Sequence, residues 1–228
     1  MKRSEWVQEI EDLFSKHADP VAAKKQSAYL LDQFSFLGLP KPKRASLQKK
    51  FFKELCHLKR EDLIEIVSLL WEKPHRELHY VAVDLLTSHW KILEESDLGW
   101  IEGFIRTHAW WDTVDVLSSN VLGKFLLRHK SLCSHMDHWI EDEFLWIRRS
   151  ALIFQLRWKK ETEEERLFGY CKKRMHENNF FIRKGIGWAL REYSKYNPQG
   201  VIQFLKENAS SLSRLSYREA NRHLSKTS

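Results

Sequence analysis

The chain has 228 residues and a net charge of +7, but only eight glycines and five prolines. This length is enough for a substantial hydrophobic core, whereas so few glycines exclude the glycine-rich loops of the usual α/β nucleotide-binding enzymes. No stretch approaches the roughly 18 apolar residues of a membrane span, and the first residues lack the apolar core of a signal peptide. We therefore expect a cytoplasmic protein with no membrane association.

Apolar residues recur every three or four positions along almost the whole chain, which is the pattern of amphipathic helices. All five prolines lie between such segments, and no segment alternates like a strand. In the first half we predict helices over residues 6–14, 22–34, 47–55, 62–70, 75–90 and 98–107. In the second half we predict helices over residues 112–128, 132–140, 144–158, 162–175, 180–196, 198–207 and 212–225.

Four of these segments recur at a nearly constant spacing. The runs begin at His75, Trp111, Ile147 and Ile182. A period of about 35 to 45 residues with two helices per unit is typical of α-solenoids. We therefore predict an all-α fold and a single domain over residues 1–228, in which HEAT-like antiparallel helix pairs curve around a concave basic groove. A non-repetitive helical bundle is the alternative.

If the chain is such an array, the starts of the four runs lie side by side on its concave face. This arrangement would bring together four residues that are far apart in sequence, namely Trp111, Asp115, Arg149 and Trp188.

The positive charge is concentrated in two places. Residues 41–60 hold eight basic residues and one acidic residue, and the rest of the chain is nearly neutral. Near the C-terminus, Arg214, Arg218, Arg222 and Lys226 recur every four residues and would form one stripe on a helix. Either feature alone could be an ordinary solvated surface. Together they favour a polyanionic partner such as nucleic acid.

No metal or cofactor site is predicted. His75 and His79 have the spacing of two ligands on one helix, but the glutamate that follows the first histidine in metalloproteases is missing, and no third ligand is apparent. The three cysteines lie far apart, which argues for a reducing compartment without disulfides.

The motif THAWWDTVDVL, residues 107–117, has two interpretations. In the structural one, Asp112 caps a helix, Asp115 completes a capping box, and Trp110 and Trp111 anchor the start of that helix. In the functional one, Trp111 and Asp115 lie one turn apart and form an aromatic wall with a carboxylate set into it. The spacing alone favours the structural interpretation.

Five motifs, taken together, carry further information about function. They are FSFLGLPKPKR (34–44), WWDTVD (110–115), FLWIRRSALIFQL (144–156), FFIRKGIGWALREY (180–193) and LSYREANRHL (215–224). In this order they resemble the AlkD-type DNA alkylation-repair glycosylases, a family of HEAT-like helical repeat proteins. The resemblance runs from the first helix to near residue 224. It implies a basic groove that holds duplex DNA and an activity that removes alkylated purines such as 3-methyladenine and 7-methylguanine.

The resemblance also implies roles for individual residues. Asp115 would be the catalytic aspartate, Trp111 and Trp188 the aromatic cleft, and Arg149 the supporting arginine. The expected DNA-binding residues combine the resemblance with the basic pattern: Tyr29, Lys41, Lys43, Arg44, Arg148, Phe181, Arg183, Lys184, Arg214, Arg218 and Arg222. Within the fourth motif, Gly185 and Gly187 weaken a helix by about 1 kcal/mol each relative to alanine, and they would permit close approach of either a neighbouring helix or DNA.

These residue types suit the implied chemistry. A cationic alkylated purine is a good leaving group, so the bond to the sugar breaks towards an oxocarbenium-like state. The Asp115 carboxylate would stabilise that cation and orient or deprotonate the attacking water, while the indoles present negative π-faces to it. Arg149 would bind a phosphate. No lysine is marked as a Schiff-base nucleophile, which indicates a monofunctional enzyme. A monomer that wraps DNA needs no partner subunit, so we expect a monomer.

Two other functions stay open. One is a DNA-binding member of the same family that has lost catalysis. The other is a helical-repeat scaffold that binds protein, in which case both basic features are merely solvated.

Overall fold

The computed structural model describes residues 2–55 and 57–224, so Lys226 of the predicted C-terminal stripe lies outside the described residues. The chain forms two compact units, residues 1–93 and residues 94–228. Contacts in a helical repeat array are mostly between sequence neighbours, so such a division can fall within one array. The predicted single domain therefore stays a prediction, as does the concave groove.

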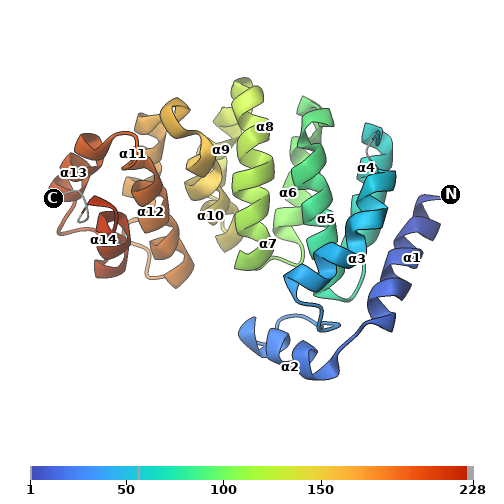
Figure 1. The fold of residues 1–228 in the computed structure, drawn as a ribbon. Coiled ribbons are helices and arrows are strands. Elements are labelled where there is room, and N and C mark those ends of the chain that lie inside the picture. Colours follow the sequence, from blue (N-terminus) through green and yellow to red (C-terminus); the bar gives the residue numbers. More distant parts are fainter. Residues whose placement is uncertain (1, 56, 225–228) are drawn as a thin grey trace. The chain divides into compact units, whose positions relative to one another are not determined.

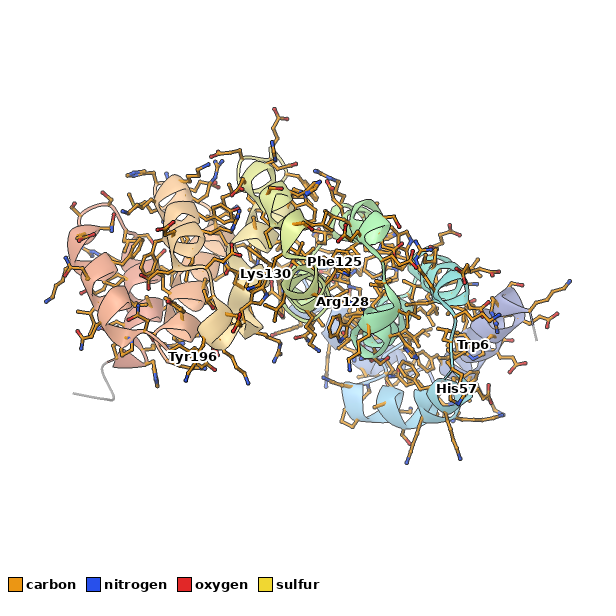
Figure 2. The ribbon with its side chains drawn as sticks, turned by 90° about the horizontal axis from the view of Figure 1, so that it is seen from above. Trp6, His57, Phe125, Arg128, Lys130 and Tyr196 are labelled. Atoms are coloured by element: carbon orange, nitrogen blue, oxygen red, sulfur yellow. The ribbon has the colours of Figure 1, made fainter. Side chains whose placement is uncertain are left out.

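Residues 1–93 form five α-helices within the described part of this unit. They are α1 (Arg3–Lys16), α2 (Pro20–Tyr29), α3 (Lys41–Glu54), α4 (Arg60–Trp71) and α5 (Arg76–His89). Helices α4 and α5 pack together, and α1 packs on α3 and α4 (Figure 1). The indole of Trp6 is buried in this core and meets the ring of Phe51 edge-on at 5.5 Å (Figure 2).

Helix α2 ends earlier than predicted. We expected it to extend to Phe34, but it ends at Tyr29, because Leu31 and Asp32 adopt left-handed backbone angles with φ of 57° and 56°. The following loop returns to α5, where the buried Glu77 carboxylate accepts hydrogen bonds from three consecutive backbone N–H groups, those of residues 37–39, at 2.9 to 3.1 Å. The loop is therefore fixed by an acceptor that hydrophobic periodicity does not reveal.

Residues 94–228 contain the remaining α-helices. They are α6 (Leu98–Arg106), α7 (Trp111–Val116), α8 (Gly123–Arg128), α9 (His135–Trp139), α10 (Leu145–Ile153), α11 (Glu164–Arg174), α12 (Phe180–Tyr193), α13 (Pro198–Glu207) and α14 (Arg214–Asn221). A π-helical segment, Leu117–Leu122, joins α7 to α8, so that residues 111–128 form one continuous helix that buries Phe125 (Figures 1 and 2). Helix α10 packs on both α7 and α12, and α12 packs on α14.

The prediction of an all-α, helical-repeat fold is confirmed. Each of the four aligned runs begins at the N-cap or in the first turn of a helix, and these helices begin at Arg76, Trp111, Leu145 and Phe180. Within the described residues there is no strand, only an isolated bridge between Ser35 and His75. No helix among them is both long and apolar enough to cross a membrane.

Candidate active site

The start of α7 differs from the structural interpretation of the WWDTVD motif. The N-cap residue is Trp110, and no side chain caps this helix end. Asp112 lies in the first turn, where a carboxylate is favoured by the helix dipole, and Asp115 lies one turn further on. The expectation that Asp112 caps the helix and Asp115 completes a capping box is therefore wrong.

The indole of Trp110 anchors this helix start. Its ring lies 5.5 Å from the ring of Trp146 and 5.5 Å from that of Phe181, and the latter two rings are 4.9 Å apart. The three rings come from the starts of α7, α10 and α12. This aromatic cluster holds the three helix starts together, since aromatic pairs at such distances add to the energy of simple burial.

The Asp115 carboxylate forms an ion pair with Arg149 of α10 and takes no part in a capping box. The Nε and Nη2 atoms of Arg149 donate to the two carboxylate oxygens of Asp115 at 2.7 and 2.8 Å. The third guanidinium nitrogen, Nη1, donates to the backbone carbonyl of Phe181 at the start of α12. Paired, bidentate bonds of this kind fix the plane of a carboxylate as well as its position.

The two members of this pair differ in exposure. The Arg149 side chain is 5% exposed and that of Asp115 is 17% exposed. The Arg149 side chain is almost wholly buried and all three of its nitrogens donate within the protein, so its placement does not suit the expected contact with a DNA phosphate. In this arrangement Arg149 fixes the orientation of the Asp115 carboxylate, and the Asp115 side chain is the more exposed of the two.

Local backbone structure also positions Asp115. The π-helical segment begins two residues after it, and the Gly123 N–H donates to the Ser118 carbonyl, five residues back. The Ser119 hydroxyl donates to the Asp115 carbonyl at 2.7 Å, and the Ser118 hydroxyl donates to that of Ser150, next to Arg149, at 2.7 Å. Single π-helical turns inside α-helices are frequent at functional sites.

Two tryptophans are predicted to form the cleft: Trp111 precedes Asp115 in the sequence, and Trp188 follows Arg149. Trp111 lies four residues before Asp115 on the same face of α7, and both are partly buried. Trp188 lies on α12 one turn after Gly185, and a methyl group at Gly185 would lie 3.3 Å from Nη1 of Arg149. Trp188 is also partly buried. Gly185 thus leaves space for the guanidinium that orients Asp115.

Gly187 permits the close approach of a different element, helix α14. A methyl group there would lie 2.5 Å from Cβ of Glu219 and 2.9 Å from the Ser216 carbonyl oxygen. The close approach that the two glycines permit is therefore that of the Arg149 side chain at Gly185 and of helix α14 at Gly187. Both are contacts within the protein.

Most of the predicted DNA-binding residues in this unit form ion pairs or hydrogen bonds. Arg148 lies 3.1 Å from Glu177, and Arg183 donates to the Glu177 carbonyl at 2.9 Å. Lys184 and Arg222 both pair with Glu219, at 3.0 and 3.2 Å. Arg214 and Arg218 are exposed and form no ion pair with any residue of the described ranges.

The predicted residues of the first unit divide into exposed and buried ones. Tyr29 is 72% exposed, and Lys41 and Lys43 are exposed at the start of α3. Arg44 is 6% exposed, bonded to Asp84 at 3.2 Å and stacked on the ring of Tyr80 at 4.6 Å. Arg44 is therefore a core ion-pair residue, and its placement does not suit a contact with a phosphate.

His79 is also a core residue. It is 1% exposed, and its two ring nitrogens lie 3.2 Å from Nη1 of Arg76 and 2.9 Å from the Lys73 carbonyl oxygen. No group of three or more metal-binding side chains occurs in the ranges that the structure describes.

Sequence reasoning missed several residues that build the site. The serines Ser118, Ser119 and Ser150 are buried on helix faces that are otherwise apolar, and Glu219 is a buried acid in a basic segment. Polar residues at buried positions of an apolar pattern are the signal that could have identified them, because buried polar groups need partners.

The chain is similar to known proteins over most of its length. A family model described as DNA alkylation repair enzyme matches residues 10–224. The structure of a predicted DNA alkylation repair enzyme from Enterococcus faecalis is 34% identical in sequence, with a TM-score of 0.85, and the match covers 92% of this chain and 97% of the other. No curated protein matches the chain.

Two structures from Streptococcus mutans share the fold at lower identity. The protein smu.31 is 19% identical with a TM-score of 0.60, over 78% of this chain and 96% of the other. AlkD2 is 20% identical with a TM-score of 0.61, over 88% of this chain and 98% of the other. Because the family model spans most of the chain and the Enterococcus structure nearly all of it, the protein belongs to the family of DNA alkylation repair enzymes.

Proposed function

We propose that this protein is a monofunctional DNA glycosylase that hydrolyses the N-glycosidic bond of cationic alkylated purines in duplex DNA, of the 3-methyladenine and 7-methylguanine type. The observation that carries the proposal is the Asp115 carboxylate, which a buried arginine holds through both oxygens while the Asp115 side chain stays 17% exposed.

A carboxylate so held suits this reaction. The bond between C1′ and the purine nitrogen breaks with both electrons leaving on the base, which becomes neutral, and positive charge develops on the sugar. A fixed negative charge stabilises that cation without having to reorient during the reaction. The oxygen of a water molecule then bonds to C1′, and one proton of that water passes to Asp115.

The partly buried indoles of Trp111 and Trp188 supply the rest of the proposed site. Their π-faces are negative and attract a cation, so they favour both the charged lesion and the charged sugar. Selection in this proposal rests on the charge of the lesion and on its ease of departure.

Exposed cations on both units support duplex DNA as the partner. Arg214 and Arg218 on α14 and Lys41 and Lys43 on α3 are exposed, and so is Tyr29 at the end of α2. Positive surface charge binds the phosphate backbone regardless of sequence.

The test is release of the base. The purified protein is incubated with duplex DNA that contains 7-methylguanine or 3-methyladenine, and the free base is separated and quantified. We expect release by the native protein and a loss of at least about 100-fold in Asp115→Asn, comparable to the loss of one transition-state contact. Asp112→Asn is the matched control, because it removes the same charge from the same helix, and it should retain release.

Two outcomes would contradict the proposal. If the native protein binds the damaged duplex but releases no base, the DNA-binding function without catalysis is correct. If Asp115→Asn releases base as fast as the native protein, the carboxylate has no catalytic role. Treatment with borohydride during the reaction should trap no protein–DNA adduct, as expected of a monofunctional enzyme.

A further inference from the structure

A buried carboxylate lies at the centre of three cations where α12 meets α14. The Glu219 side chain is 5% exposed, and its Oε1 lies 3.0 Å from Nζ of Lys184. Its Oε2 lies 2.8 Å from Nη1 of Arg191 and 3.2 Å from Nη1 of Arg222. Two of these cations come from α12 and one follows α14 directly.

The carboxylate reaches this position because Gly187 has no side chain. Lys184, Gly187 and Arg191 follow one another along one side of α12, and Glu219 lies over the glycine between the two cations. The Ser216 hydroxyl donates to the Arg183 carbonyl at 2.9 Å and holds the same two helices together (Figure 1). The three cations are therefore held at the close packing contact between α12 and α14.

Glu219 is charged in this environment. Burial opposes its ionisation, but the hydrogen bond from Lys184 and the charges of the three cations outweigh burial, so the pKa of the carboxyl lies below its ordinary value. Three positive charges therefore surround one negative charge, and the cluster keeps an excess of two positive charges.

The cations are more exposed than the acid that holds them. The Lys184, Arg191 and Arg222 side chains are 36%, 27% and 61% exposed. An ammonium group has three donors and a guanidinium five, and each cation donates only one hydrogen bond to Glu219. Donors remain on each cation for an anion arriving from solvent.

We propose that Lys184, Arg191 and Arg222 form a binding site for one backbone phosphate of DNA, and that Glu219 is the residue that positions these cations. The proposal rests on the proposed function only in taking DNA as the partner, and it does not require catalysis.

The proposed phosphate site lies on α12 next to the candidate cleft residue Trp188. Lys184 lies four residues before Trp188 and Arg191 three residues after it, so the two cations flank the candidate cleft tryptophan along the helix. A phosphate held between them fixes the DNA backbone beside Trp188. Contacts to phosphates set the register of a protein on DNA.

The substitution Glu219→Gln distinguishes two roles for this residue, namely positioning of the cations and a contribution to net charge only. The two roles predict changes of opposite sign in the affinity for DNA. If the cluster acts only through its net charge, removal of a negative charge tightens DNA binding. If Glu219 positions the cations, the glutamine loses the charge-assisted bonds, the cations separate, and binding weakens although the protein becomes more positive.

The experiment measures the affinity for an undamaged duplex by fluorescence anisotropy at several salt concentrations. We expect Glu219→Gln to bind about 3-fold to 10-fold more weakly, as for the loss of one ordinary hydrogen bond. Glu207→Gln is the matched control, since it removes an equal charge from an exposed site on α13 and should bind equally or more tightly. Unchanged or tighter binding by Glu219→Gln would overturn the proposal.

Two further measurements keep the test decisive. Lys184→Ala should weaken binding and reduce the slope of log affinity against log salt by about 1, and Glu219→Gln should add little in that background. If Glu219→Gln does not fold by circular dichroism, Lys184→Ala and Arg191→Ala decide, and unchanged slopes in both refute the site. Because undamaged DNA is used, a protein that releases no base can still pass this test.

Discussion

Arg149 holds Asp115 through two parallel hydrogen bonds of 2.7 and 2.8 Å, while its third nitrogen is fixed to the carbonyl of Phe181. One buried guanidinium thus ties together α7, α10 and α12. A lysine keeps the charge but has neither the planar geometry nor the number of donors to make these three bonds. The orientation of the carboxylate therefore depends on arginine itself.

We expect Arg149→Lys to lower the rate constant of base release on the order of 100-fold, the cost of misplacing a reacting group by about 1 Å. Single-turnover kinetics with enzyme in excess measure this rate constant without interference from product release. In an Asp115→Asn background the same substitution should have little further effect, since residues acting as a unit are not additive. Full multiplication of the two losses would show that Arg149 acts independently of Asp115.

The hydroxyls of Ser118 and Ser150 are fully buried and joined at 2.7 Å, with Ser150 also donating to the Trp146 carbonyl at 2.8 Å. We expect Ser118→Ala and Ser150→Ala each to lower the free energy of unfolding by about 1 kcal/mol. The double variant should lose less than the sum, because the second substitution removes a group that the first has already left without its partner. Urea unfolding measures all three. Strict additivity would mean that the two hydroxyls are not coupled.

The period of the helix starts was sufficient to predict that Asp115 and Arg149 lie together, because stacked repeats bring equivalent positions side by side. The π-helical segment after Asp115 could not be predicted, since its local sequence is compatible with an ordinary helix and tertiary packing decides between the two. The sequence also does not show which cations are exposed and which are buried. Arg44 and Arg218 both look like surface cations in the sequence, but Arg44 meets Asp84, forty residues away, and is buried.

The two glycines of α12 should respond differently to alanine. Gly187→Ala places a methyl group 2.5 Å from Cβ of Glu219 and 2.9 Å from a backbone oxygen, so α14 must move, and we expect a loss of about 1 to 3 kcal/mol in stability. Gly185→Ala meets its nearest atom at 3.3 Å, and the gain of about 1 kcal/mol in helix propensity offsets that tighter contact. Thermal unfolding of both variants under identical conditions compares them. A larger loss for Gly185→Ala would contradict this assignment of the two glycines.

The lowered pKa of Glu219 predicts how its contribution to stability depends on pH. An unperturbed glutamate titrates near 4.5, and Glu219 in the folded protein titrates below that value because of the hydrogen bond and charges of its three cations, which outweigh its burial. Its ionised form therefore stabilises the folded state fully above pH 4.5, and this stabilisation is lost as the pH falls through the folded pKa.

The measurement is the free energy of unfolding of the native protein and of Glu219→Gln, by urea titration at a series of pH values. We expect a constant difference in favour of the native protein above pH 4.5 and a difference that shrinks below it. Other acids whose pKa values are lowered, such as Asp137 and Asp142, are present in both proteins and cancel in the comparison. A difference that does not change between neutral and acidic pH would mean that Glu219 carries no charge in the folded state.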